Sequence, residues 1–269
     1  MNEIKHHDLE ELVYKILSIS YLAGAKILEI YRTSFSVDNK KDNSPVTAAD
    51  MMAHNIICEH LRKLTPSVPI LSEESSDVSF CDSHKWKQYW LVDPLDGTRE
   101  FIKRNDEFSV NIALIEGHRA ILGVVLIPVT GICYTAAVNH GARKHDMDGA
   151  TNQISVKKTD SNNIIVAGSR SYGNKRQNAF IQKLNNPEIL SIGSSLKFCI
   201  VAEGKADIYP RFGPTSEWDT GAAQIIVEEA GGKVVDMNFN QLKYNTKESI
   251  LNPDFFVIAD KQFDWQQYL

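Results

Sequence analysis

Residues Trp90–Phe101 read WLVDPLDGTREF and carry the most informative pattern in the chain. The apolar run Tyr89–Val92 predicts a buried strand that ends at Asp93, because Pro94 has no backbone N–H for a sheet ladder. Asp93 and Asp96 then bracket a tight turn, so both carboxylates can point into one small volume. Two crowded carboxylates repel each other and need a cation or a shared proton.

The residues after the second aspartate suggest an anion site. Gly97 allows the backbone to bend or to approach a ligand closely, and Thr98 begins a helical turn whose free N–H groups can hold an anion. Mg²⁺ prefers oxygen ligands, often carboxylates together with substrate phosphate. The segment therefore predicts a Mg²⁺ site beside a phosphate cradle. A polar β-turn is the alternative, since Asp-Pro-x-Asp-Gly is also favourable turn chemistry.

A pair of acids earlier in the chain extends this pattern. Glu73 and Glu74 follow the apolar run Val68–Leu71, which predicts a short strand. A strand that ends at Glu73 beside one that ends at Asp93 would bring the two side chains together. A solvated pair of loop charges is the alternative.

Two more acids stand where helices are expected to begin. Asp219 begins the helix expected at Asp219–Ala230, and Asp50 follows Thr47 at capping-box spacing. An acid at either place is a favourable N-terminal cap. Capping does not exclude metal binding or catalysis, so both interpretations stay open.

Toward the N-terminus, the sequence predicts helices. Asp8 and Glu11 have capping-box spacing before an apolar face of helical period that extends to Ile30. After the polar loop Asp38–Pro45, a second helix is expected to begin near Thr47. Beyond the central motif, alternating apolar residues predict an antiparallel meander of strands at Phe108–Ile115, Ile121–Ile127 and Ile132–Ala137.

The second half alternates short strands with helices, which is typical of α/β structure. We expect a subdomain at residues 1–155 of α+β type with most of the metal ligands. Residues 156–269 would form an α/β subdomain that carries Asp219 and substrate-recognition loops, and the two would share one cleft. The expected elements are strands at Ile164–Ala167, Ile189–Ser191, Ala206–Tyr209, Lys233–Asp236 and Phe255–Ala259, and helices at Arg176–Leu184, Ser194–Glu203 and Asp219–Ala230.

Composition excludes several classes of protein. Of the 269 residues, 43% are hydrophobic and 23% charged, as in ordinary globular proteins, and the net charge of −5 argues against a broad basic nucleic-acid-binding face. The longest strongly apolar run, Ala120–Val129, is too short for a transmembrane helix of ~20 residues. The N-terminus lacks a signal-peptide pattern, so we expect a cytoplasmic protein, with peripheral attachment to the inner membrane left open. The well-separated cysteines predict reduced, buried thiols: Cys58, Cys81, Cys133 and Cys199.

Taken together, these segments resemble the inositol monophosphatase superfamily of Mg²⁺-dependent, lithium-sensitive phosphomonoesterases. The family's marks are a Glu-Glu strand end, an Asp-Pro-x-Asp-Gly-Thr turn, and a late Trp-Asp before a helix that ends in Gly-Gly. Within it, the chain is most similar to the CysQ type, the bacterial 3'(2'),5'-bisphosphate nucleotidases. The supporting stretches are KDNSPVTAAD (41–50), PILSEE (69–74), YWLVDPLDGTREFIKRNDEFSVNIALI (89–115), SIGSSLKFCIVAEGKADIYPRFGPTSEWDT (191–220) and LNP (251–253).

The resemblance implies a fold and a metal site. The fold would be a layered α/β/α/β/α sandwich with the site between its halves. Two or three Mg²⁺ ions, about the number that such phosphatase sites use, would be held by Glu73, Asp93, the backbone carbonyl of Leu95, Asp96 and Asp219. Side-chain chemistry alone could not have found Leu95.

The resemblance also implies catalytic roles and a substrate. Glu73 would orient an attacking water, Thr98 would hydrogen-bond it, and Asp50 would accept from the Thr98 hydroxyl. The expected reaction converts adenosine 3',5'-bisphosphate, a by-product of sulfate assimilation, to AMP and phosphate. The residues expected at the substrate are Glu73, Leu95, Asp96, Gly97, Thr98, Ser194, Ser195, Lys197, Arg211 and Asp219.

The second phosphate of that substrate would meet Lys197 and Arg211. Ser194 and Ser195 could donate hydrogen bonds at the start of their helix. Arg suits bidentate phosphate binding, and Arg211 stands in the Pro- and Gly-rich stretch YPRFGP (209–214). An exposed helix lysine is the alternative for Lys197.

Two other functions stay open. An inositol-1-phosphate or other sugar phosphatase would use the same chemistry on a different alcohol. A non-catalytic nucleotide or phosphate sensor would require a broken set of site residues, whereas all of the expected acids and Thr98 are present. The expected partner is a small molecule and not a nucleic acid, and the sequence leaves monomer and homodimer open.

Overall fold

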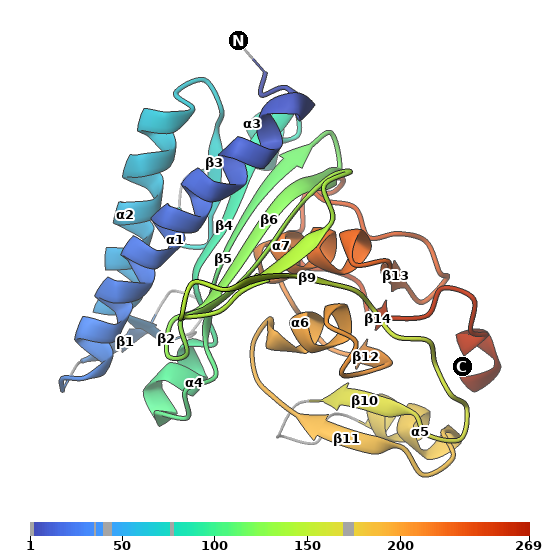
Figure 1. Cartoon of the computed structure of the whole chain (residues 1–269). Coiled ribbons are helices and arrows are strands. Elements are labelled where there is room, and N and C mark those ends of the chain that lie inside the picture. Colours follow the sequence, from blue (N-terminus) through green and yellow to red (C-terminus); the bar gives the residue numbers. More distant parts are fainter. Residues whose placement is uncertain (1–2, 35, 40–44, 76–77, 169–174) are drawn as a thin grey trace.

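The computed structural model describes residues 3–34, 36–39, 45–75, 78–168 and 175–269, so residues 41–44 of the KDNSPVTAAD stretch lie outside the described residues. Within them, two large sheets and the surrounding helices stack into layers (Figure 1). The sandwich implied by the resemblance is confirmed. The helices are α1 (Leu9–Tyr31), α2 (Ala48–Leu64), α3 (Phe80–Ser83), α4 (Thr98–Lys103), α5 (Lys175–Lys183), α6 (Leu196–Ala202) and α7 (Glu217–Glu229), with 3₁₀ turns at His6–Asp8 and Trp265–Tyr268.

The larger sheet has its strands in chain order, from β3 at one edge to β9 at the other. β3 runs parallel to β4, and every later neighbour is antiparallel, so the predicted meander is confirmed. The strands are β3 (Ile70–Ser72), β4 (Gln88–Asp96), β5 (Ser109–Glu116), β6 (Arg119–Ile127), β7 (Ile132–Ala137), β8 (Ala142–His145) and β9 (Thr151–Ile154).

β4 corrects one prediction, because the strand does not end at Asp93. It continues to Asp96, and its register against β5 shifts between Asp93, which pairs with Asn111, and Asp96, which pairs with Ser109. Pro94 falls inside this irregular segment, where its missing N–H breaks no regular ladder bond.

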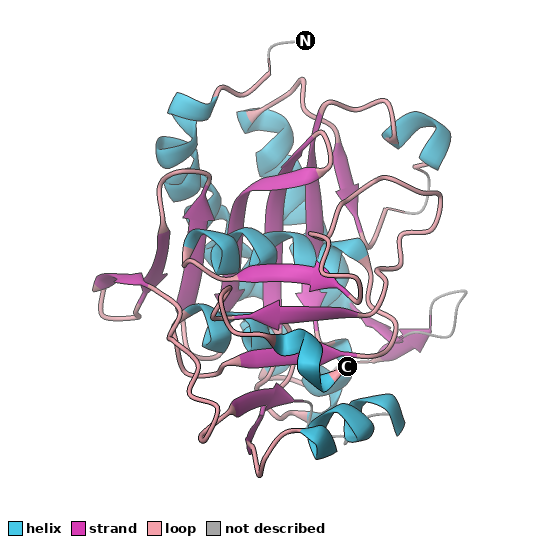
Figure 2. Ribbon diagram, turned by 90° about the vertical axis from the view of Figure 1, so that its right-hand side faces the viewer, coloured by secondary structure: helices cyan, strands magenta, loops and turns pink. Residues whose placement is uncertain are grey.

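The smaller sheet has the strand order β11-β10-β12-β14-β13. β10 is parallel to β11 and β12, while β14 is antiparallel to both of its neighbours. Figure 2 shows its strands crossing in front of the larger sheet. The strands are β10 (Ile165–Gly168), β11 (Glu188–Ser191), β12 (Ile208–Arg211), β13 (Lys233–Asp236) and β14 (Phe255–Ile258), and a separate ribbon pairs β1 (Val37–Asn39) with β2 (Pro45–Thr47).

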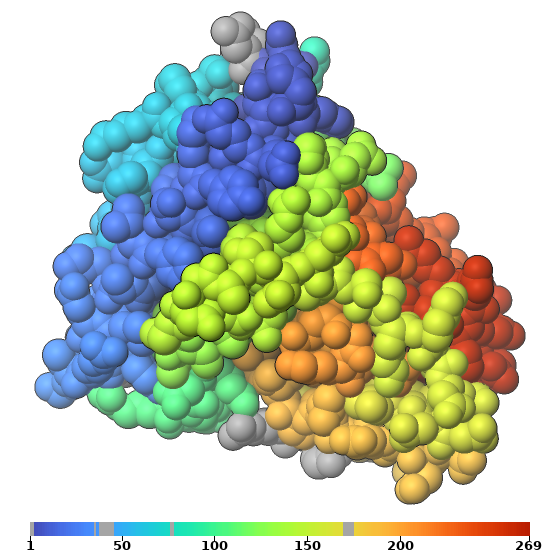
Figure 3. All heavy atoms as spheres, viewed as in Figure 1, coloured from blue at the N-terminus to red at the C-terminus, as the bar shows by residue number. Residues whose placement is uncertain are grey.

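Buried side chains fill the spaces between the layers. One apolar cluster joins α1 and α2 to the larger sheet, a second surrounds α6 and α7 between the sheets, and a third packs α5 and the C-terminal turn on the smaller sheet. β5 serves two of them by alternation, since Ile112 and Leu114 face α1 and α2 while Ala113 and Ile115 face α7. Figure 3 shows α1 and the β8–β9 hairpin side by side on one face.

Two helix starts differ from the sequence prediction. Asp8 precedes α1, but its side chain makes no capping hydrogen bond, because the His6–Asp8 turn leads directly into the helix. α7 begins at Glu217 rather than at Asp219, with Ser216 as its cap. Asp219 is instead the third helical residue and accepts the Ser216 N–H at 2.9 Å.

Candidate active site

Three carboxylates from two distant segments meet in one place. Asp93 and Asp96 come from the irregular end of β4, and Asp219 comes from the first turn of α7. One oxygen of each lies within 4.8 Å of the others. The structure therefore brings together acids that the sequence separates by more than a hundred positions.

The charges of this cluster need compensation. Burial, followed by the charges of Glu73, Asp96 and Asp219 and a hydrogen bond with Glu73, raises the pKa of Asp93 well above its ordinary value. Burial and then the charge of Asp96 raise the pKa of Asp219 to about 8. An all-oxygen, crowded donor set of this kind fits a hard divalent cation such as Mg²⁺, which would replace the protons.

Glu73 reaches the cluster through strand pairing. Ser72 of β3 lies opposite Val92 of β4, and the Glu73 N–H donates to the Val92 carbonyl at 3.0 Å. The side chain that follows β3 therefore stands beside Asp93, as expected from two neighbouring strand ends.

A threonine–aspartate pair flanks the carboxylates. The Thr98 hydroxyl lies 3.1 Å from Asp50 Oδ1 and 3.3 Å from the Leu95 carbonyl. Asp50 Oδ2 also accepts the N–H and hydroxyl of Thr47, each at 2.7 Å, so the predicted capping box at α2 is confirmed. Asp50 is buried and orients Thr98 while it caps its own helix.

Gly97 links these two parts of the site. Its φ of +92° is left-handed, a conformation that favours glycine. A Cβ there would also lie 3.0 Å from the Glu107 carbonyl. Only glycine can therefore turn the chain here without strain.

The polar groups of Ser195 are already hydrogen-bonded to residues of the site. Its N–H and hydroxyl lie 2.7 and 2.9 Å from Asp96 Oδ2, and the hydroxyl is also 2.9 Å from the Asp219 carbonyl. Asn111 donates to the same hydroxyl at 2.9 Å. Sequence reasoning missed Asn111, although a buried amide within an apolar strand was an available clue. α6 begins at Leu196, so the predicted start at Ser194 is also corrected.

A cavity of about 410 Å³ opens beside the carboxylates, between α4, α6 and β12. Lys197 lines it but is buried, and its Nζ donates to the Ser194 carbonyl at 2.6 Å, so the alternative of an exposed lysine is wrong. Burial lowers the pKa of Lys197 to about 8.

Arg211 also lines the cavity. Its Nη2 donates to the Pro214 carbonyl at 2.9 Å, while its buried Nε has no partner among the described residues. Sequence reasoning missed Arg99, Lys103 and Gln177, which also line the cavity.

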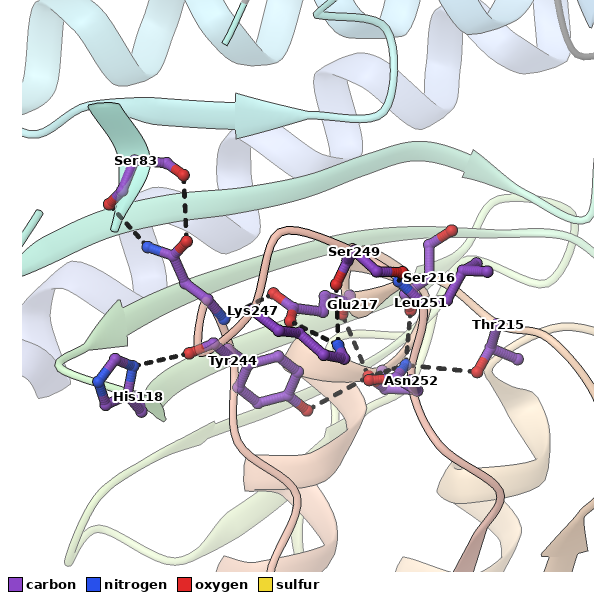
Figure 4. Close-up of polar contacts among 12 residues, drawn as sticks. Ser83, His118, Thr215, Ser216, Glu217, Tyr244, Lys247, Ser249, Leu251 and Asn252 are labelled. Carbon is purple, nitrogen blue, oxygen red and sulfur yellow. Dashed lines mark hydrogen bonds and ion pairs between the residues drawn. The ribbon is translucent and has the colours of Figure 1, made fainter. Parts of the chain in front are cut away.

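Residues 244–252 hold the start of α7 in place (Figure 4). The Asn252 amide donates to the Ser216 carbonyl at 2.8 Å and to Thr220 Oγ1 at 3.1 Å. Buried Glu217 accepts the Asn245 N–H at 2.8 Å, and Asn245 also bonds to Ser83, the last residue of α3. This network fixes the turn of helix that carries Asp219.

Comparison with known proteins identifies this arrangement. The sequence profile of the inositol monophosphatase family matches residues 8–263. The chain belongs to this family. The inositol monophosphatase family is metal-dependent, and the acidic cluster is where this member can bind metal.

Individual relatives cover nearly the whole chain. The 3'(2'),5'-bisphosphate nucleotidase CysQ of Escherichia coli is 47% identical over 90% of this chain and 98% of its own. The CysQ of Haemophilus influenzae is 37% identical over 96% of both chains. The crystal structure of CysQ from Bacteroides thetaiotaomicron, described as a bacterial member of the inositol monophosphatase family, superposes with a TM-score of 0.82 at 38% identity and covers 94% of this chain and 98% of that one.

The helices and the cysteines of this inositol monophosphatase fold bear on two further expectations. None of the described helices is both long and apolar enough to cross a membrane. The four cysteines are free, as predicted, but Cys81 is exposed while Cys58, Cys133 and Cys199 are buried. Cys81 lies in the short helix α3, of which only Ser83 is buried.

Proposed function

We propose that this protein is a Mg²⁺-dependent 3'(2'),5'-bisphosphate nucleotidase that hydrolyses adenosine 3',5'-bisphosphate to AMP and phosphate. The observation that carries the proposal is the 47% identity to a CysQ nucleotidase over 90% of the chain, together with an intact set of site residues. A sensor that had lost catalysis would have no need to keep all of these acids.

The metal site would use the carboxylates described above. Glu73, Asp93, the Leu95 carbonyl, Asp96 and Asp219 would hold two or three Mg²⁺ ions, about the number that such sites use. When bound, Mg²⁺ would supply charge neutralisation at the phosphate and acidify a coordinated water.

The protein's own groups would position the reactants. Because the Thr98 hydroxyl can donate its proton to Asp50, its lone pairs are free to accept a hydrogen bond from the attacking water. Glu73 would accept a second hydrogen bond and hold that water in line with the bond that breaks. The N–H groups of Gly97 and Thr98 would bind phosphate oxygens. Such positioning accounts for most of the catalysis that a protein can supply to phosphoryl transfer.

Lys197 of α6 and Arg211 of β12 would interact with the second phosphate from the side of the cavity opposite α4. Arg211 lines the cavity and would present its guanidinium to this phosphate. Lys197 already bonds to the Ser194 carbonyl, so it would act through its charge and by holding the loop before α6. Ser194 and Ser195 would shape the same loop.

Phosphate release by the purified protein tests the proposal. Adenosine 3',5'-bisphosphate and inositol 1-phosphate would be compared with Mg²⁺, with EDTA, and with Li⁺ added to Mg²⁺. We expect Mg²⁺-dependent, Li⁺-inhibited release with a strong preference for the nucleotide. A preference for inositol 1-phosphate would keep the metal site but overturn the substrate, and no release from either would overturn the proposed activity.

A further inference from the structure

The near wall of the cavity carries two basic side chains that the reaction described above does not use. Arg99 and Lys103 both belong to α4, the short helix that follows the Asp-Gly-Thr turn. Both line the cavity, and both are exposed. Figure 1 places α4 below the lower ends of the strands of the larger sheet, near the second half of the chain.

The two side chains lie on one face of the helix. Residues four apart are neighbours one turn from each other, and like charges at this spacing destabilise a helix. Among the residues that the structure describes, neither cation has a hydrogen bond or ion pair that would offset this repulsion. An anion placed between them would.

The cations of the opposite wall differ in this respect. Lys197 Nζ lies 2.6 Å from the Ser194 carbonyl and 5.3 Å from the centre of the Tyr209 ring. Arg211 already donates to the Pro214 carbonyl. Arg99 and Lys103 therefore offer more uncommitted donors to a ligand than Lys197 and Arg211 do.

The charge of the cavity favours a second anionic group. Apart from the carboxylate cluster, Glu100 is the single acid among its described lining residues, whereas the cations are Arg99, Lys103, Lys197 and Arg211. Thr98, at the reacting phosphate, and Lys103 are separated by ~7.5 Å along the helix axis, at ~1.5 Å per residue. One ribose separates its 3'- and 5'-phosphates by a comparable length.

We propose that Arg99 and Lys103 form a clamp for the non-reacting phosphate and so determine the preference for nucleoside bisphosphates over monophosphates. This inference rests on the proposed function. The phosphate would sit between α4 and the Arg211 wall, with the reacting phosphate held at Gly97 and Thr98. Arg99 can bind it through two N–H groups and Lys103 through a point charge.

Steady-state kinetics on two substrates test the clamp. Adenosine 3'-monophosphate has the same scissile bond as adenosine 3',5'-bisphosphate but lacks the second phosphate. We expect Arg99→Ala and Lys103→Ala each to lower kcat/KM for the bisphosphate about tenfold or more, mainly through KM. The loss for the monophosphate should be much smaller, and Arg99→Lys and Lys103→Arg should retain most of the preference. Lys26→Ala, an exposed lysine paired with Glu29 on α1, is the control for the change in net charge.

Calorimetric titration of adenosine 3',5'-bisphosphate into metal-free protein separates this proposal from the proposed function. Weaker binding by the double variant Arg99→Ala/Lys103→Ala than by wild type supports the clamp whatever the rate of turnover. Hydrolysis of the bisphosphate by wild type with equal losses on both substrates, or no loss, overturns the clamp alone. A wild-type protein that neither binds nor hydrolyses the bisphosphate overturns both.

Discussion

Ser195 donates two hydrogen bonds to the Asp96 carboxylate, from its N–H at 2.7 Å and from its hydroxyl at 2.9 Å. Asp93 and Asp219 each place a carboxylate oxygen within 4.8 Å of Asp96. Asp96 is therefore held in position by hydrogen bonds and also contributes negative charge to the cluster. The hydrogen bonds fix the direction of the Asp96 carboxylate, and its charge raises the pKa values of Asp93 and Asp219 beside it.

Asp96→Asn should lower kcat/KM by roughly 10²–10³-fold or more, because it removes a charge on which metal binding depends. The metal-free variant should melt at the wild-type temperature or above, since one repulsive charge is gone. Phosphate release and thermal unfolding followed by circular dichroism would measure both effects. Asp148→Asn, at an exposed turn aspartate, is the control. Wild-type activity in Asp96→Asn would contradict the assignment.

The stabilising effect of Mg²⁺ should increase with pH. The pKa of Asp219 rises from 3.8 to about 8 in the folded protein, mainly through burial, so the folded state holds a proton that the unfolded chain releases. Metal-free protein should therefore lose stability as the pH rises from about 4 to about 8. Mg²⁺ replaces the proton, so adding Mg²⁺ should raise the Tm of the protein more at pH 8 than at pH 6. Thermal melts with Mg²⁺ or EDTA would show this, and a pH-independent increase would argue against it.

At the scale of elements, α7 owes its position to a loop near the end of the chain. The Asn252 side chain is buried and donates to Ser216, Thr215 and Thr220 around the first turn of the helix (Figure 4). Loss of these bonds leaves the Ser216 carbonyl with the Asp219 N–H at 3.1 Å and the Thr220 hydroxyl with the Tyr244 hydroxyl at 3.3 Å, so each oxygen loses its shorter hydrogen bond. The loop therefore influences the metal site without contacting it.

Asn252→Ala should reduce the free energy of unfolding by about 1–3 kcal/mol. It should also weaken Mg²⁺ binding, because the turn that carries Asp219 loses its support. Asn240→Ala is a matched control, since Asn240 is exposed and its amide bonds only to Asp236 among the described residues. Urea unfolding and Mg²⁺ titration would compare the two variants. Equal Mg²⁺ affinity in both would mean that Asn252 stabilises the fold without positioning the site.

At the scale of the whole molecule, the central helical layer packs very closely on the larger sheet. A Cβ added to Gly123 of β6 would lie 2.2 Å from the Ala222 carbonyl of α7 and 2.5 Å from Ile225. The obstacle is backbone, which cannot rotate away as a flexible side chain can. The absence of a side chain at Gly123 therefore determines how closely α7, which carries Asp219, approaches the larger sheet.

Gly123→Ala should destabilise the protein by about 1–3 kcal/mol or more, because α7 must move away from the sheet. Activity should fall as well, at temperatures where the variant remains folded. Gly168→Ala provides the comparison, since a Cβ there would make an ordinary contact of 3.4 Å with Ile189. Chemical denaturation and phosphate release would measure both, and similar results for the two variants would contradict this account of the layer.

The sequence by itself determined the strand alternation of β5, the capping box at Thr47 and the acids around the Asp-Pro-x-Asp-Gly-Thr turn. These are local, because side-chain period, cap spacing and turn chemistry act over a few residues. Family resemblance added the order of layers. The resemblance also implied one metal site for Asp93 and Asp219. Only the tertiary structure decided that Ser195 and Asn111 secure Asp96, that Lys197 is buried, and that α4 faces the cavity with two uncommitted cations. Those facts depend on how distant segments pack, and residues far apart in sequence carry no local pattern that records the contact.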